Sequence, residues 1–151
     1  MNWFLLLFGC VWLTAGPARA AEGVRVLVHE KGQTRTLTGA AADAVQRECE
    51  RLLAGAKDRR LLMVTPDRIQ AVERKAAAVE VIYPEPALLE MEGRRVRVMA
   101  LLAPLGGPLP GDLMLYRLEG GTGYGATDHV VCEHGVEDLK QVLKANNIKL
   151  K

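Results

Sequence analysis

The sequence predicts an α+β fold: an antiparallel β-sheet with two or three helices packed on one face. Short segments in which apolar and polar residues alternate recur along the chain, as in half-buried strands. Longer segments instead repeat apolar residues every three or four positions, as amphipathic helices do. The resulting order is strands, two helices, several strands and a last helix, which favours helices packed on an antiparallel sheet.

The first twenty residues have the features of a cleavable secretory signal. Residues 4–13 are almost wholly apolar, but this run is too short to cross a bilayer, which takes roughly 20 residues. Pro17 breaks the helix after it, and Ala18-Arg19-Ala20 offers the small residues that a signal peptidase requires. We therefore expect cleavage after Ala20, a single domain over residues 21–151, and a secreted or periplasmic location.

Two other interpretations of the leader fit the sequence less well. Residues 7–10 resemble a lipid-modification box, but the apolar run continues past Cys10 and only nine residues precede it. The length of the run also disfavours an uncleaved anchor. The leader departs from the usual pattern because no Lys or Arg precedes the apolar run. No later segment is long and apolar enough to span a bilayer, so we expect no membrane span after cleavage.

The first half of the remaining chain is predicted to hold two strands and two helices, at residues 24–29, 34–38, 39–54 and 66–77. The strands follow from alternation around a turn at 31–33. The first helix carries an apolar stripe that includes Cys49, with Thr38 as N-cap and Gly55 as stop. Thr65-Pro66 marks the start of the second helix. The apolar run 61–64 is too short to classify.

The second half is predicted to hold four strands and a helix, at residues 79–83, 87–91, 95–102, 113–118 and 136–145. Pro84 and Pro86 are expected to stop the first of these strands. Glu92-Gly93-Arg94 reads as a hairpin turn between the next two. Residues 104–111, rich in proline and glycine, form a loop. Residues 128–134 fit either a strand or a helix.

The composition after the leader excludes several function classes. This part contains no Trp, Phe or Ser, and its aromatic residues are Tyr83, Tyr116 and Tyr124. The lack of serine excludes a serine nucleophile. The 19 basic and 18 acidic residues nearly balance, so the surface exerts no long-range attraction on phosphate backbones. Because stacking platforms are also scarce, we expect no nucleic-acid partner.

Two cysteines remain after removal of the leader, Cys49 and Cys132. An even pair in an oxidising compartment predicts a disulfide between them. Such a bridge would close a loop of 84 residues and stabilise the domain by roughly 4–5 kcal/mol on chain-entropy grounds.

The densest polar cluster lies at residues 128–134 and suggests a metal site built on His129, Cys132 and His134. An extended segment would place Asp128, Cys132 and His134 on one face, whereas a helix would group His129, Cys132 and Glu133. Thiolate and imidazole suit zinc or copper. A structural site usually shows two spaced ligand pairs, and this one would need His29 or Cys49 as a further ligand. We therefore favour a bridged Cys132 flanked by solvated histidines.

A thiol enzyme is the related alternative, with Cys132 as nucleophile and His134 and Asp128 as base and orienting group. Neighbours in sequence rarely converge in this way, because the members of a triad usually come from separate segments. The alternative also requires Cys132 to be a free thiol.

A glycine-rich segment supplies the candidate ligand-binding residues Gly121, Gly123, Tyr124 and Gly125. It follows a strand, as phosphate loops do, but it lacks the lysine of a P-loop and no clear helix begins directly after it. The simpler interpretation is a mobile connection. If the domain binds a ligand, this loop and the loop at 104–111 are the expected contact edges, with Tyr124 as an exposed anchor.

The sequence thus predicts an exported, noncatalytic domain that binds an unknown protein or small ligand and needs no cofactor. The alternative is a metal-binding or thiol-dependent enzyme centred on His129, Cys132 and His134.

Overall fold

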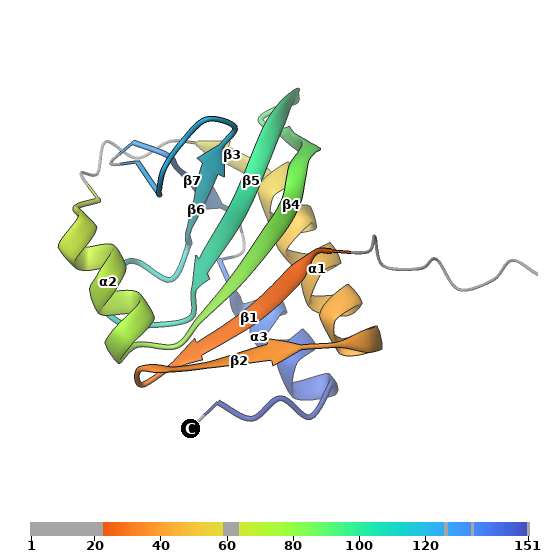
Figure 1. The fold of residues 1–151 in the computed structure, drawn as a ribbon, viewed down its shortest axis with the longest axis vertical. Coiled ribbons are helices and arrows are strands. Elements are labelled where there is room, and N and C mark those ends of the chain that lie inside the picture. Colours follow the sequence, from red (N-terminus) through yellow and green to blue (C-terminus); the bar gives the residue numbers. More distant parts are fainter. Residues whose placement is uncertain (1–22, 59–63, 126, 134, 151) are drawn as a thin grey trace, which may run out of the picture.

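In the computed structural model, residues 23–58, 64–125, 127–133 and 135–150 form a sheet flanked by three helices (Figure 1). The strands are β1 (Arg25–Glu30), β2 (Gln33–Leu37), β3 (Ala56–Asp58), β4 (Ala78–Met91), β5 (Arg94–Pro104), β6 (Leu113–Leu118) and β7 (His129–Cys132). The helices are α1 (Gly39–Ala54), α2 (Pro66–Lys75) and α3 (Glu137–Ala145).

The sheet has seven strands in the order β2-β1-β4-β5-β6-β7-β3, and every neighbouring pair is antiparallel. The long β4–β5 hairpin lies near its centre, and the short strands β2 and β3 form its edges. The predicted α+β class with an antiparallel sheet is therefore confirmed.

Helices cover both faces of the sheet. α1 and α3 pack on one face, where alternate strand residues such as Val79, Val81 and Leu101 join the larger apolar core. α2 packs on the other face over Ala78 and Leu102, and Figure 1 shows the sheet between α2 and the other two helices. We call these the α1–α3 face and the α2 face. Two helices thus share one face, as predicted, while the third protects the opposite one.

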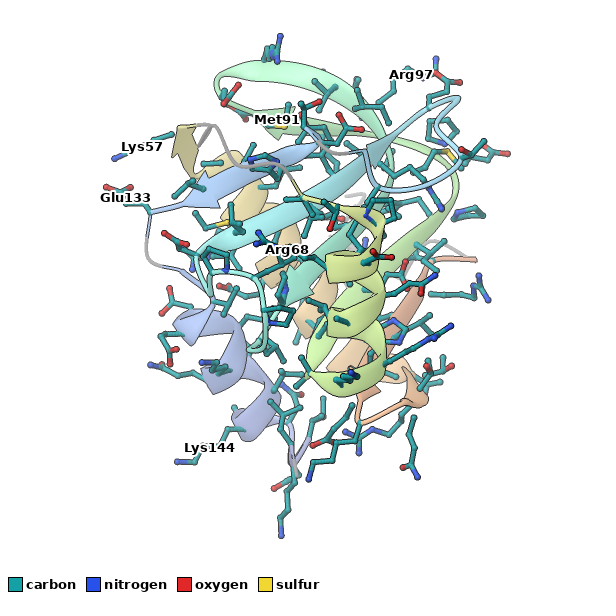
Figure 2. All side chains as sticks on the ribbon, turned by 90° about the vertical axis from the view of Figure 1, so that its left-hand side faces the viewer. Lys57, Arg68, Met91, Arg97, Glu133 and Lys144 are labelled. Atoms are coloured by element: carbon teal, nitrogen blue, oxygen red, sulfur yellow. The ribbon has the colours of Figure 1, made fainter. Side chains whose placement is uncertain are left out.

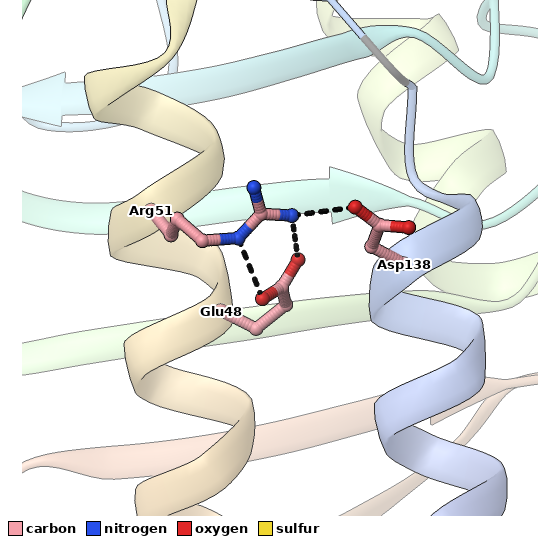
Figure 3. A network of polar contacts seen from close by, with 3 residues as sticks. All are labelled: Glu48, Arg51 and Asp138. Carbon is pink, nitrogen blue, oxygen red and sulfur yellow. Dashed lines mark hydrogen bonds and ion pairs between the residues drawn. The ribbon is translucent and has the colours of Figure 1, made fainter.

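An ion-pair network joins α1 to α3 on the outside of the larger core (Figure 3). The guanidinium of Arg51 donates to Glu48 at 2.7 and 2.9 Å and to Asp138 at 2.6 Å. The side chain of Arg51 is about half exposed, and such surface pairs stabilise a fold by no more than about 1 kcal/mol. The apolar residues beneath this network, such as Leu53 and Leu139, which are both fully buried, hold the two helices on the sheet.

The prediction that Pro84 and Pro86 end a strand is wrong. β4 continues to Met91, and its register with β5 shifts between Ile82 and Ala87. Pairing of β4 with β1 already ends at Ile82, so within the described residues no strand on that side requires the N–H groups that the prolines lack. An irregular hairpin therefore extends beyond the rest of the sheet.

The turn of this hairpin follows the prediction. Glu92 and Gly93 have φ values of 51° and 72°, and the paired residues Met91 and Arg94 flank them. Two successive positive φ values are typical of the tight turns whose twist matches that of antiparallel strands.

Three further predictions can be compared with the structure. Residues 129–132 form strand β7, which resolves the ambiguity in favour of an extended segment. Strand β3 was not predicted, because only three residues form it and they pair with β7 irregularly. Of the unclassified run 61–64, residues 61–63 lie outside the described part, and Val64 is fully buried under α2.

The predicted bridge between Cys49 and Cys132 is not present, and both residues are free, buried thiols. Both belong to the core of the α1–α3 face, Cys49 from α1 and Cys132 from β7. A buried thiol packs as a small apolar group, so each fills space in this core without a cross-link. Across the described ranges, no helix combines the length and apolar character that crossing a membrane takes.

Candidate functional site

The structure separates the residues of the predicted metal site. Strand β7 alternates its side chains between the two faces of the sheet. Cys132 and Val130 enter the core of the α1–α3 face, whereas His129 pairs with Leu115 of the α2 face. His129 is only 3% exposed, so it is not the solvated histidine that we expected. His134 lies outside the described residues, and elsewhere no three His, Cys, Asp or Glu side chains gather as metal ligands would.

Both thiols lie in environments that oppose ionisation. Burial raises the pKa of Cys132 to about 11, and the charge of Asp112 adds to this shift. The pKa of Cys49 is raised still further, first by burial and then by the charges of Glu48, Glu50 and Cys132. A nucleophilic or metal-binding cysteine needs its thiolate form. These surroundings therefore support packing roles for Cys49 and Cys132.

The glycine-rich loop divides into an exposed tip and an anchored end. Gly121 and Gly123 are exposed, whereas Tyr124 and Gly125 are half-buried. A Cβ at Gly125 would meet the carboxylate of Asp128, so a larger residue there requires that side chain to move. Tyr124 packs beside the apolar cluster under α2 instead of standing out as an exposed anchor.

The hydroxyl of Tyr124 reaches a polar network that the sequence did not reveal. It donates to Oε1 of Glu80 at 2.8 Å, and Nε2 of His29 lies 2.9 Å from Oε2 of the same carboxylate. Nδ1 of His29 lies 3.0 Å from the hydroxyl of Thr34. Glu80 and His29 are 9% and 8% exposed. The network ties the loop and the β1–β2 hairpin to the centre of the sheet.

Register explains how these residues meet. Leu27 pairs with Glu80, and His29 follows Leu27 on the same face of β1, so His29 and Glu80 are diagonal neighbours. Thr34 lies directly opposite His29 on β2. Strand alternation can predict which face of its own strand His29 or Glu80 occupies. It cannot predict that the two residues meet, because this depends on the pairing of β1 with β4, which are separated by two helices in the chain.

The network keeps Glu80 charged. Burial by itself would raise the pKa of this carboxyl group, but the hydrogen bonds from His29 and Tyr124, with the charges of His29 and Arg117, hold the pKa below its usual value. Both ring nitrogens of His29 and both oxygens of Glu80 are engaged. The arrangement therefore serves to position the loop, and it leaves His29 no nitrogen for the metal role considered above.

A pocket of about 520 Å³ lies between α3 and the segment that follows it. We call it the α3 pocket. Its lining has three apolar side chains, those of Leu143, Ile148 and Leu150. It also has three basic side chains, those of Lys140, Lys144 and Lys149, and the polar residue Asn147. Its volume falls within the roughly 300–1,000 Å³ of typical small-molecule sites.

The end of α3 creates this pocket. Asn147 has a φ of 57°, and its N–H donates to the carbonyl of Lys144 at 3.0 Å. The N–H of Ile148 donates to the carbonyl of Leu143 at 2.9 Å. These two bonds around a left-handed residue form a Schellman motif, which reverses the chain at a helix end. Ile148 is thereby buried with Leu143, and Lys149 and Leu150 line the pocket together with residues of α3.

The basic side chains of the pocket differ in their surroundings. Lys140 is half-buried and donates to Glu137 at 2.6 Å, so a neighbouring carboxylate balances its charge. Lys144 and Lys149 are exposed, and neither forms an ion pair with any residue that the structure describes. Figure 2 shows Lys144 extending from the end of α3 into solvent. The pocket thus combines apolar residues with two exposed lysines, of which Lys149 also borders a smaller hollow that contains Glu30.

Sequence reasoning missed the α3 pocket. The apolar pattern predicts a helix over residues 136–145 only, so it does not cover the residues that complete the pocket. The signal that could have found the pocket is the sequence Asn146-Asn147-Ile148, because asparagine is one of the few residues that tolerates the left-handed position after a helix.

Comparison with known proteins identifies no relative: no family model, no curated protein and no solved structure matches this chain.

Proposed function

We propose that this chain is an exported, noncatalytic domain that binds a small ligand in the α3 pocket. The observation that carries the proposal is the pocket itself, a hollow of about 520 Å³ with buried apolar residues at its base. Ligand sites are typically concave and mostly apolar, with a few polar groups that fix orientation. The pocket has both features, whereas the loop that we expected to bind ligands is anchored to the sheet through Tyr124.

The metal or thiol enzyme is the weaker candidate on this geometry. Its core residues His129 and Cys132 belong to opposite faces of the sheet. The raised pKa of Cys132 also opposes formation of the thiolate that such chemistry requires.

Binding at the α3 pocket is testable by NMR with isotope-labelled protein. A panel of neutral and charged probes, each with a short or long alkyl chain, is titrated while the amide signals of Leu143, Ile148 and Leu150 are followed. At least one long-chain probe should shift these signals in a saturable manner and leave those of α2, on the opposite face of the sheet, unchanged. If no probe moves the pocket signals, the proposed function is wrong.

A matched pair of variants at Asn147 provides the control. Asn147→Gly keeps the left-handed position free of strain, so the pocket and its binding should persist. Asn147→Val places a β-branched residue at a φ of 57°, which should open the turn and abolish binding. Equal binding by both variants would place the ligand elsewhere.

Export is tested by the intact mass of the product recovered from an envelope fraction or culture medium. The leader hypothesis requires cleavage after Ala20, which removes both tryptophans. The product should therefore show tyrosine emission without tryptophan emission. Full-length material recovered from the cytosol would refute this part of the proposal.

A further inference from the structure

We infer that the ligand of the α3 pocket is a single-chain amphiphile with one anionic head, such as a long-chain carboxylate. This inference rests on the proposed function, because it assigns a chemical class to the ligand of the same pocket. The pocket lies outside every candidate site that the sequence suggested.

The apolar part of such a ligand matches the floor of the pocket. Leu143 and Ile148 are 1% and 7% exposed, and Leu150 is half-buried against the same core. All three residues line the pocket, together with the side chains of the three lysines. Each methylene group that a ligand buries there strengthens binding by the hydrophobic effect. A long alkyl chain therefore gains more than a compact polar molecule.

The head of the ligand is specified by charge. The three amino groups at the pocket are positive, and among the described residues the carboxylate that pairs with them is that of Glu137, bound to Lys140. Lys144 and Lys149 remain available to hold a carboxylate, while their alkyl stems can cover the chain of the ligand. A cationic head would meet repulsion at this rim, and a neutral head would leave both charges without a partner.

The surroundings favour a small molecule over a membrane surface. The chain after the leader has 19 basic and 18 acidic residues, so it lacks the excess positive charge that attracts anionic bilayers over a distance. The pocket volume of about 520 Å³ is also that of a small-molecule site. One molecule can fill it, whereas a bilayer presents a surface much wider than this hollow.

The experiment measures the affinity of dodecanoate by calorimetry, below its critical micelle concentration, and compares it with three other probes. Dodecanol has the same chain without charge, dodecyltrimethylammonium reverses the charge, and butyrate keeps the head with a short chain. Dodecanoate should bind most tightly and should weaken as salt is added. Dodecanol should bind about threefold to tenfold more weakly, as expected for the loss of an exposed charge interaction.

Lysine variants locate the head group. Lys144→Gln and Lys149→Gln should each weaken dodecanoate by about threefold to tenfold and leave dodecanol unchanged. Lys140→Gln should have a smaller effect because Glu137 already compensates that charge. Lys75→Gln, on the exposed side of α2 and away from the pocket, is the matched control and should change neither affinity.

The outcomes separate this inference from the proposed function. If dodecanol or the cationic probe binds in the α3 pocket as tightly as dodecanoate, the anionic class is wrong while the binding function stands. If anionic vesicles bind but monomeric dodecanoate does not, the partner is a membrane surface and the inference is overturned. If no probe shifts the amide signals of the pocket residues in the NMR titration, both proposals fail.

Discussion

Replacing Tyr124 with phenylalanine keeps the aromatic ring and removes the hydroxyl that donates to Glu80. The lost bond is 2.8 Å long and its acceptor is a carboxylate that is 9% exposed. Hydrogen bonds to charged groups contribute roughly 1.5–3 kcal/mol to stability. Because Tyr124 is only half-buried and water can reach its end of the bond, we expect a loss near the lower value, about 1.5 kcal/mol. Urea denaturation at pH 7 should show a lower midpoint with an unchanged slope.

The same substitution should change the response to acid. The pKa of Glu80 is lowered in the folded protein, so this carboxylate stabilises the fold above its unfolded pKa of about 4.3. That contribution is lost as the pH falls through the folded pKa. Removing the Tyr124 bond allows the pKa of Glu80 to rise toward its usual value. The acid-induced loss of stability should therefore be smaller in Tyr124→Phe.

A matched control lies on the other face of the sheet. Tyr83 also donates to a carboxylate, that of Glu50, at 2.8 Å. Tyr83→Phe should lower stability by a similar amount but leave the titration of the Glu80 carboxyl signal in carbon NMR unchanged. The reasoning is refuted if Tyr124→Phe neither lowers the denaturation midpoint nor moves that titration, or if Tyr83→Phe moves it equally.

Three further predictions test the packing. Gly107→Ala should lower the free energy of unfolding by well over 1 kcal/mol, because φ is 97° and the added Cβ would lie 2.5 Å from the Cβ of Ala76. Gly93→Ala, which has a positive φ but open space around it, is the control and should lower the free energy of unfolding by about 1 kcal/mol in the same denaturation assay. Cys49 and Cys132 should resist thiol reagents in the native protein and react fully after denaturation without reductant, whereas no reaction would reveal a bridge. Arg51→Ala should lower stability by less than about 1 kcal/mol, since its ion pairs are exposed; a loss of several kcal/mol would contradict this.

Local pattern was sufficient to predict most of the elements. The stripe of apolar residues bounded by Thr38 and Gly55 gave α1 its observed limits. The N-terminus of α2 was equally clear from Thr65-Pro66. These predictions succeed because the information lies within one segment: periodicity decides which side can be buried, and proline and glycine decide where a helix starts or stops.

Predictions that depend on a distant partner failed or stayed open. Pro84 and Pro86 were expected to end β4, but its pairing with β1 ends at Ile82 and its register with β5 shifts between Ile82 and Ala87, so the N–H groups that the prolines lack are not needed for pairing. Whether Cys49 meets Cys132 depends on the packing of α1 on β7, which spacing along the chain does not encode. The same holds for His129, whose face is set by its pairing with Leu115.

The sequence by itself determined the α+β class, the limits of α1 and the exclusion of a serine nucleophile, since these follow from composition and from short-range periodicity. Tertiary structure decided that α2 protects the second face, that Glu80 meets His29 and Tyr124, and that the segment after α3 forms a pocket with this helix. The physical reason is that burial and hydrogen bonding join residues through space. A network or a pocket therefore exists only once strand order, register and helix ends are fixed together.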